Sequence, residues 1–97
     1  MDYNEHITAR RRLSILEILN GVPTVTMHEV DLKRTLADGM QAVDTETLRD
    51  DLRWLHARNM ILATQPGGVW FATLTAKGGD ARQGLIFEDG LARPELR

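Results

Sequence analysis

Cysteine is absent from the 97 residues of this chain, and aromatic residues make up only 5% of it. Without cysteine there is no disulfide framework and no thiolate metal site, which suits a reducing cytosol. No apolar run approaches the roughly 20 residues that a membrane helix needs, and the N-terminus MDYNEHITARRR is too polar for a secretory signal. The sequence therefore predicts one small cytoplasmic domain with no membrane partner.

An excess of positive charge is also missing. The chain has 12 Lys and Arg against 14 Asp and Glu, so its formal net charge at pH 7 is −2. A strongly basic composition would indicate a polyanionic partner, and this composition does not. Any nucleic-acid surface must therefore arise from a local cluster of cations.

Patterns typical of catalysis are missing as well. The only serine, Ser14, lies within a predicted helix, and the three histidines show no metal-ligand spacing. Asp50 and Asp51 are adjacent, so on a helix they point about 100° apart and do not form a catalytic pair. Neither of the glycine-rich phosphate-binding patterns, GxGxxG and GxxxxGK[ST], occurs. We expect a protein that is not an enzyme and has no cofactor and no metal.

The first helix is predicted over residues 4–20 and ends at Gly21, with Pro23 shortly after. Its apolar side chains cover an arc of about 220°, which is wider than the single stripe of a surface helix. Such a helix is either central to the domain or covered on a second side by a partner.

The stretch VTMHEV contains a capping-box pattern. Thr26 is the expected N-cap, Glu29 reaches back to its amide, and the two valines stand where a hydrophobic staple would form. This pattern predicts a helix over residues 27–38 that buries Val30 and Leu36.

A second cap follows the turn at Gly39. Asp44 precedes a helix predicted to end near Asn59, and a stripe of leucines lines one face of it: Leu48, Leu52 and Leu55. Two capped helices joined by a short turn make a helix-turn-helix pattern.

A β-hairpin is predicted next, with strands over residues 60–65 and 69–74 around Pro66-Gly67-Gly68. A weak helix is predicted over residues 75–82, because two adjacent glycines lower its helix propensity. Residues 85–97 form a C-terminal tail, expected to be partly docked or flexible.

This order of elements resembles a winged helix-turn-helix domain over residues 1–84: a mainly α fold with a three-helix core and a small β-hairpin as the wing. Two stretches, LRDDLRWLHARNMI and ATLTAKGGDARQG, together with the Arg-Pro near the C-terminus, resemble the small winged-helix proteins of Mu-like phages and prophages, sometimes labelled ArsR-like. The resemblance implies a DNA-binding role in transcription regulation or DNA handling, in the cytoplasm of the host cell.

Binding of double-stranded DNA is the first functional hypothesis. The second helix of such a motif enters the major groove, and here its candidate reading residues are Thr45, Thr47, Arg49 and Arg53. The candidates for DNA-backbone contact are Arg10, Arg11, Lys33 and Arg34. By helical angle, Arg10 and Arg11 are expected to point away from the apolar arc and Arg12 toward it.

Glu46 and Asp50 oppose the DNA hypothesis. Both lie in the middle of the expected reading face, where they would approach a strongly negative groove. The hairpin stretch, residues 62–75, has no Lys or Arg with which to contact phosphate.

The alternative is a protein-interaction module that keeps the fold without a DNA-binding surface, such as a dimeric adaptor for a phage or host protein. Strand alternation leaves Trp70 or Phe71 outward unless residues 85–87 of the tail or another chain covers it. Trp54 lies well off the leucine stripe, so all three aromatics are candidate interface residues. A homodimer is expected under both hypotheses.

Overall fold

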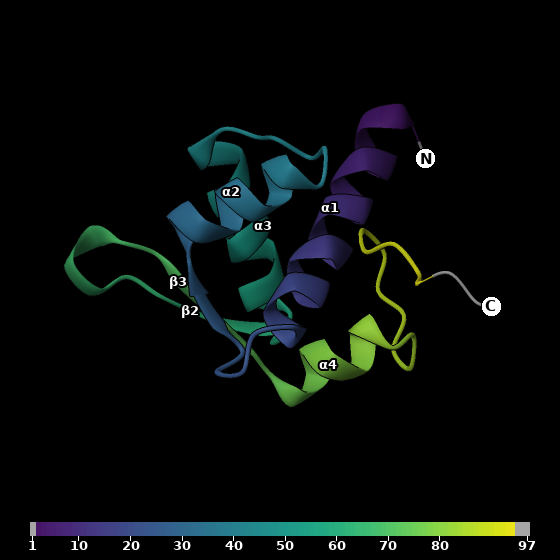
Figure 1. Ribbon diagram of the computed structural model, residues 1–97. Helices are drawn as coiled ribbons and strands as arrows, with labels where there is room; N and C mark the ends of the chain where they lie inside the picture. Colours follow the sequence, from purple (N-terminus) through teal and green to yellow (C-terminus); the bar gives the residue numbers. More distant parts are fainter. Residues whose placement is uncertain (1, 95–97) are drawn as a thin grey trace.

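The computed structural model describes residues 2–94, which form four α-helices and a three-stranded antiparallel sheet (Figure 1). The described chain is mainly helical, and its sheet has the strand order β1-β3-β2. The helices are α1 (Tyr3–Asn20), α2 (Glu29–Asp38), α3 (Thr45–Ala57) and α4 (Ala76–Arg82). The strands are β1 (Thr26–His28), β2 (Ile61–Thr64) and β3 (Phe71–Leu74).

Helix α1 is central to the fold, as the wide apolar arc allows. It contacts α2, α3, α4 and β3. It begins one residue earlier than predicted, with Asp2 as its N-cap, and it ends before Gly21 as predicted. The core that it shares with the other elements consists of buried aliphatic side chains, chiefly Ile15, Leu16, Leu19, Leu32, Leu36, Leu48, Leu52, Leu55, Met60 and Ile61.

The capping box predicted at the start of α2 is wrong. Residues 26–28 form strand β1, and α2 begins at Glu29, with His28 accepting a hydrogen bond from the Asp31 amide as its N-cap. Thr26 instead pairs with Thr73 of β3. Val30 is 54% exposed rather than buried, whereas Leu36 lies in the core as expected. A T-x-x-E pattern is local, and strand pairing with a segment far along the chain overrides it.

The cap predicted for α3 is confirmed. Asp44 Oδ1 accepts a hydrogen bond of 2.7 Å from the Thr47 amide, and the leucine stripe of the helix is buried. The helix ends at Ala57, two residues earlier than expected. Asn59 then takes the left-handed backbone conformation (φ 61°) that asparagine tolerates better than most residues.

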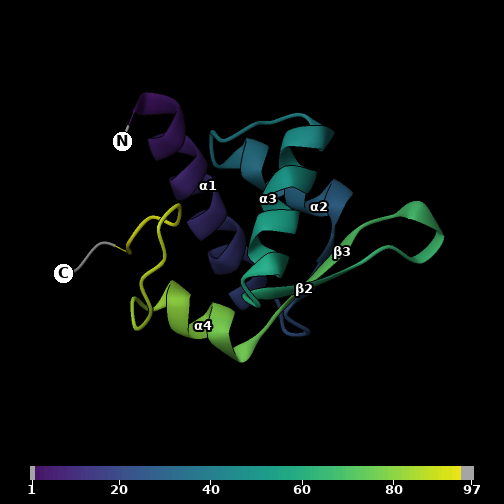
Figure 2. The same cartoon turned by 180° about the vertical axis from the view of Figure 1, so that it is seen from behind.

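The hairpin and the last helix are also confirmed, with shorter strands than predicted. Strands β2 and β3 pair in register from Ile61–Leu74 to Thr64–Phe71 around a 3-10 turn at Pro66–Gly68. This hairpin projects away from the helices (Figures 1 and 2).

The close packing of helix α4 on Met60 requires glycine at position 78. A Cβ at that position would lie 2.0 Å from the Met60 carbonyl oxygen, so only glycine fits there.

After α4 the chain turns back and runs along α1 (Figure 1). The Ala92 amide donates a hydrogen bond of 3.2 Å to the Ala9 carbonyl, and Ile86 and Leu91 pack against the core. We call this docked segment, residues 85–92, the strap. Residues 95–97 of the predicted tail lie outside the described residues.

Candidate interaction surface

The outward side of α3 carries the residues predicted to read DNA. Thr45 and Thr47 lie in its first turn and are partly exposed. Hydrogen bonds from Thr47 lower the pKa of the Asp44 carboxyl, and the nearby positive charges of Lys33 and Arg11 add to this effect. This end of the helix therefore holds a carboxylate that stays ionised, at the position where a phosphate would approach.

Arg49 is engaged by a buried carboxylate. Its Nε and Nη2 lie 3.0 Å and 2.9 Å from Oε1 of Glu29, which is buried, and its Nη1 lies 3.5 Å from Glu46. The second oxygen of Glu29 accepts a hydrogen bond of 2.6 Å from the Trp70 amide. Glu29 thus joins the start of α2 to α3 and to β3. Sequence reasoning assigned Glu29 to a cap, and no local signal distinguishes the two roles.

Arg53 is the more available of the two arginines. It is exposed and pairs with Asp50 at 2.7 Å, and Asp50 is itself exposed. An ion pair between two exposed side chains contributes little, so it can open for a ligand at small cost. The guanidinium of Arg53 also lies 5.1 Å from the centroid of the Trp70 ring.

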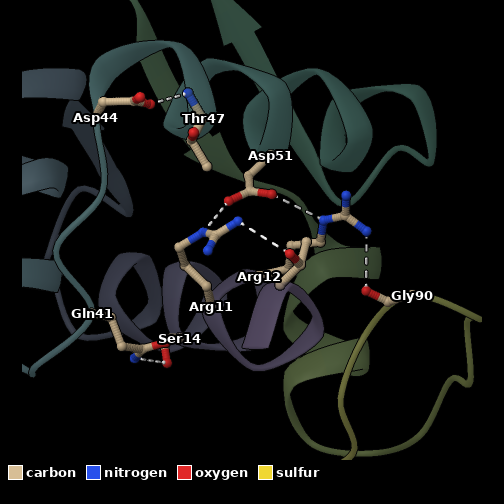
Figure 3. A network of polar contacts seen from close by, with 9 residues as sticks. Arg11, Arg12, Ser14, Gln41, Asp44, Thr47, Asp51 and Gly90 are labelled. Carbon is tan, nitrogen blue, oxygen red and sulfur yellow. Dashed lines mark hydrogen bonds and ion pairs between the residues drawn. The ribbon is translucent and has the colours of Figure 1, made fainter. Parts of the chain in front are cut away.

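The basic run Arg10-Arg11-Arg12 does not form one surface. Arg10 is exposed, but Arg11 is buried and pairs with Asp51, which also accepts a hydrogen bond of 3.1 Å from Arg12 (Figure 3). The expectation that Arg11 points away from the core is therefore wrong. Asp51 on α3, 2% exposed, supplies the charge that allows an arginine to be buried there.

The two cations of α2 differ in exposure. Lys33 Nζ donates a hydrogen bond of 3.1 Å to Thr45 Oγ1, which brings this predicted backbone-contact residue beside the first turn of α3. Arg34 is 71% exposed and lies 3.7 Å from Asp31. Of the predicted DNA contacts, the structure thus brings Lys33 together with Thr45, and it leaves Arg10 on a different helix.

The three candidate aromatic residues are buried or partly buried. Trp70 is 7% exposed and belongs to the core, so Phe71 is the hairpin aromatic on the outward side, which is one of the two arrangements that alternation allowed. Phe71 points to the other side of the sheet and contacts His28 edge to face, with ring centroids 5.8 Å apart. Trp54 is partly buried beneath the strap, where a Cβ at Gly90 would lie only 2.7 Å from its ring.

The expected covering of Trp54 and Trp70 by residues 85–87 is only partly found. Ile86 packs against the core, but Leu85 and Phe87 are exposed. The contact with Trp54 is made by Gly90, which lies further along the strap than expected.

The outer face of the sheet is the side that the core does not cover. The inner side carries Ile61, Ala72 and the other residues that pack on the helices. On the outer side, strand pairing forms two rows of neighbours: Thr26, Thr73 and Leu62 in the first, and His28, Phe71 and Thr64 in the second. None of these six residues is Asp, Glu, Lys or Arg.

Two apolar side chains of this face are open to solvent. Leu62 is 52% exposed and Val69, which precedes β3 on the same side, is 42% exposed. Charged residues are 27% of the chain, and none of them lies on this face. Depletion of charge with exposed apolar side chains is typical of the centre of a protein–protein interface.

Two polar residues of types used in catalysis, Ser14 and His56, have structural partners. Ser14 accepts a hydrogen bond of 2.7 Å from Gln41 (Figure 3), and His56 accepts one of 3.1 Å from the Ala63 amide. Within residues 2–94, no group of three or more His, Asp or Glu side chains is placed to hold a metal ion. None of the helices in this range is long and apolar enough to cross a membrane.

Comparisons with known proteins identify no relative: no protein-family model, curated protein or solved structure matches this sequence. The resemblance to winged-helix proteins of Mu-like phages therefore stays a prediction.

Proposed function

We propose that this chain is a winged helix-turn-helix domain that acts as a non-enzymatic protein-interaction module, with the outer face of its sheet as the contact surface. The element order supports the fold: α2 and α3 are the two helices of the motif, and the β2–β3 hairpin is the wing. The phage or prophage setting and the expected homodimer remain part of this proposal.

The absence of charge on the outer sheet face carries the functional proposal. A wing that contacts DNA needs cations for phosphate, and residues 62–75 contain none. The same face exposes Leu62 and Val69. Covering these apolar side chains with a neutral protein surface removes them from water, which is favourable. The occupied arginines support this assignment, because Arg11 and Arg49 already neutralise buried carboxylates.

DNA binding is the second candidate, and one observation favours it. Lys33 adjoins Thr45 at the start of α3, the end of the helix that enters the groove in helix-turn-helix proteins, and Arg34 is exposed on the same helix as Lys33. Arg53 can leave its exposed pair with Asp50 and join them. Few cations would then contact phosphate, so binding would be weak and its salt dependence shallow.

A salt titration separates the two candidates. The chain is titrated into a labelled mixed-sequence DNA duplex, and the fluorescence anisotropy of the duplex is measured at salt concentrations from about 20 mM to about 200 mM. We expect no saturable binding at any salt concentration. Binding whose affinity falls with a log–log slope of about −0.9 per contacted phosphate would favour DNA instead, and Arg34→Ala should then lower that slope.

Site-specific photocrosslinking tests the contact surface itself. A benzoylphenylalanine is placed at Leu62 or Val69, and at Arg34 as the matched exposed control, in cells of the source organism. We expect a discrete protein adduct from the two sheet positions and none from the control. Adducts from position 34 alone, or adducts to nucleic acid, would contradict the proposal.

A further inference from the structure

The strap lies in a site that recognises it through specific contacts. Arg58 Nε lies 3.1 Å from Glu88 Oε1, and Arg12 Nη1 donates a hydrogen bond of 3.2 Å to the Gly90 carbonyl (Figure 3). Both guanidiniums also lie over the Trp54 ring, at 4.2 Å for Arg12 and 3.9 Å for Arg58. The site thus offers two cations and an aromatic surface to an extended backbone.

Gly90 makes the fit selective. A Cβ at this position would lie 2.7 Å from Trp54 Cζ2 and 3.1 Å from Arg12 Nη1. Its φ of 95° is in a region that other residues rarely adopt. A bound segment therefore needs glycine above Trp54 and, two residues earlier, a carboxylate for Arg58.

The strap is held by single contacts rather than by regular secondary structure: Ile86 and Leu91 pack against the core, and the Ala92 amide bonds to the Ala9 carbonyl. It has no helix or strand, its Glu88–Arg58 pair is about one-third exposed, and Leu85 and Phe87 point into solvent. An open groove remains between α1 and residues 86–94. Segments with few buried contacts open at a small fraction of the global unfolding free energy. Opening of the strap would break these contacts and leave the helices and the sheet in place.

We propose that the site over Trp54 is a peptide-binding groove that the strap closes in the free chain. Its ligand is an extended segment of a partner protein that carries a carboxylate two residues before a glycine. The charge complementarity is already visible, because Glu88 and the Gly90 carbonyl occupy the positions that the ligand would take. None of the residues of this groove belongs to the outer sheet face, so this proposal is independent of the proposed function.

The test uses the full chain and the two tryptophan indole N–H signals in a ¹⁵N NMR spectrum, with Trp54→Phe to assign them. Gly90→Ala should release the strap and shift the Trp54 signal toward that of a solvent-exposed indole. A synthetic peptide with the sequence of residues 85–94 is then added to this variant. We expect saturable return of the signal toward its original position.

Matched peptides and a matched variant provide the controls. The peptide with alanine in place of Gly90 should bind at least tenfold more weakly, and the peptide with glutamine in place of Glu88 several-fold more weakly. In the chain, Gly79→Ala makes the same chemical change where the added Cβ contacts nothing within 4 Å, so it should leave the Trp54 signal unmoved. Glu88→Gln in the chain gives a second way to loosen the strap without added volume.

Three results would overturn the proposal. The first is an unmoved Trp54 signal in both the Gly90→Ala and Glu88→Gln chains while circular dichroism shows them folded. The second is no response to millimolar peptide, or equal binding of the glycine and alanine peptides. The third is that the unlabelled full chain displaces the peptide from the Gly90→Ala chain as strongly as unlabelled peptide does. The site would then bind the strap of a second copy of this chain.

Discussion

The inward and outward sides of α3 use the same residue types in opposite ways. Asp51 faces α1 and pairs with both the buried Arg11 and Arg12, whereas its neighbour Asp50 faces solvent and pairs with Arg53. The first aspartate is 2% exposed, and the second is open to water. Charge on the inward side therefore stabilises the packing of α3 on α1, and charge on the outward side is available to a ligand.

The same division extends to the glutamates near Arg49. Glu29 is buried and joins three elements through Arg49 and the Trp70 amide, while Glu46 contacts Arg49 from solvent at 3.5 Å. Counting charges along the sequence treats these residues as equal. Their energetic contributions differ because burial removes the water that would otherwise solvate an unpaired charge.

The largest expected effect is that of Asp51→Asn. The change leaves the buried Arg11 without its counter-charge, so we expect the free energy of unfolding to fall by about 3–5 kcal/mol. Asp50→Asn, the neighbouring control, should lower it by less than about 1 kcal/mol because its pair is exposed. Urea denaturation followed by circular dichroism measures both, and equal losses would break the distinction between the two sides of α3.

Glu29→Gln should have the next largest effect. It weakens charge-assisted hydrogen bonds to Arg49 and to the Trp70 amide, for an expected loss of about 1.5–3 kcal/mol. The matched control is Glu46→Gln, which should change stability by no more than about 0.5 kcal/mol. The same denaturation experiment compares them, and a loss in the control as large as that of Glu29→Gln would show that Arg49 depends on both partners.

The adjacent glycines of α4 extend the comparison to uncharged residues. Gly78→Ala places a Cβ against the Met60 carbonyl and should destabilise the fold by about 1–3 kcal/mol. Gly79→Ala meets open space and removes backbone freedom from the unfolded chain, so it should stabilise by up to about 1 kcal/mol. Thermal unfolding should therefore show shifts of opposite sign. A rise in melting temperature for Gly78→Ala would show that α4 is not packed on Met60 as described.

The smallest expected effect concerns the exposed cap of α3. Because the folded pKa of Asp44 lies below its ordinary value of 3.8, its contribution to stability is present above that pH and is lost as the pH falls through the lowered pKa. Asp44→Asn keeps a capping side chain, so it should reduce the loss of stability below pH 3.8 while changing little at pH 7. Denaturation at a series of pH values measures this, with Asp38→Asn as the exposed control; identical pH profiles for the variants and the parent would contradict it.

Local sequence patterns predicted most of the elements. Gly21 marked the end of α1, Asp44 marked the start of α3, and Pro66-Gly67-Gly68 marked the turn of the hairpin. These signals work because caps and turns are satisfied by residues three or four positions away. Strand β1 was missed because its partner, β3, lies more than 40 residues later in the chain.

The candidate surfaces were predicted less well than the elements. Helical angles placed Arg11 in solvent, but Asp51 provided a partner that no local pattern shows. Strand alternation predicted that Trp70 or Phe71 would face outward, and only the packing of the sheet on the helices decided that Trp70 is the buried one. The uncharged hairpin, in contrast, could be identified from the sequence alone, because its composition needs no partner to be known.

The sequence by itself determined the helices, the uncharged hairpin and the lack of net positive charge. Only the tertiary structure decided which charges are structural: Asp51 and Glu29 bind arginines from the core side, while Asp50 and Glu46 remain in water. It also decided that the strap covers Trp54. The physical reason is that caps, turns and periodicity act over one or two helical turns, whereas burial of a charge depends on a counter-charge from a distant segment.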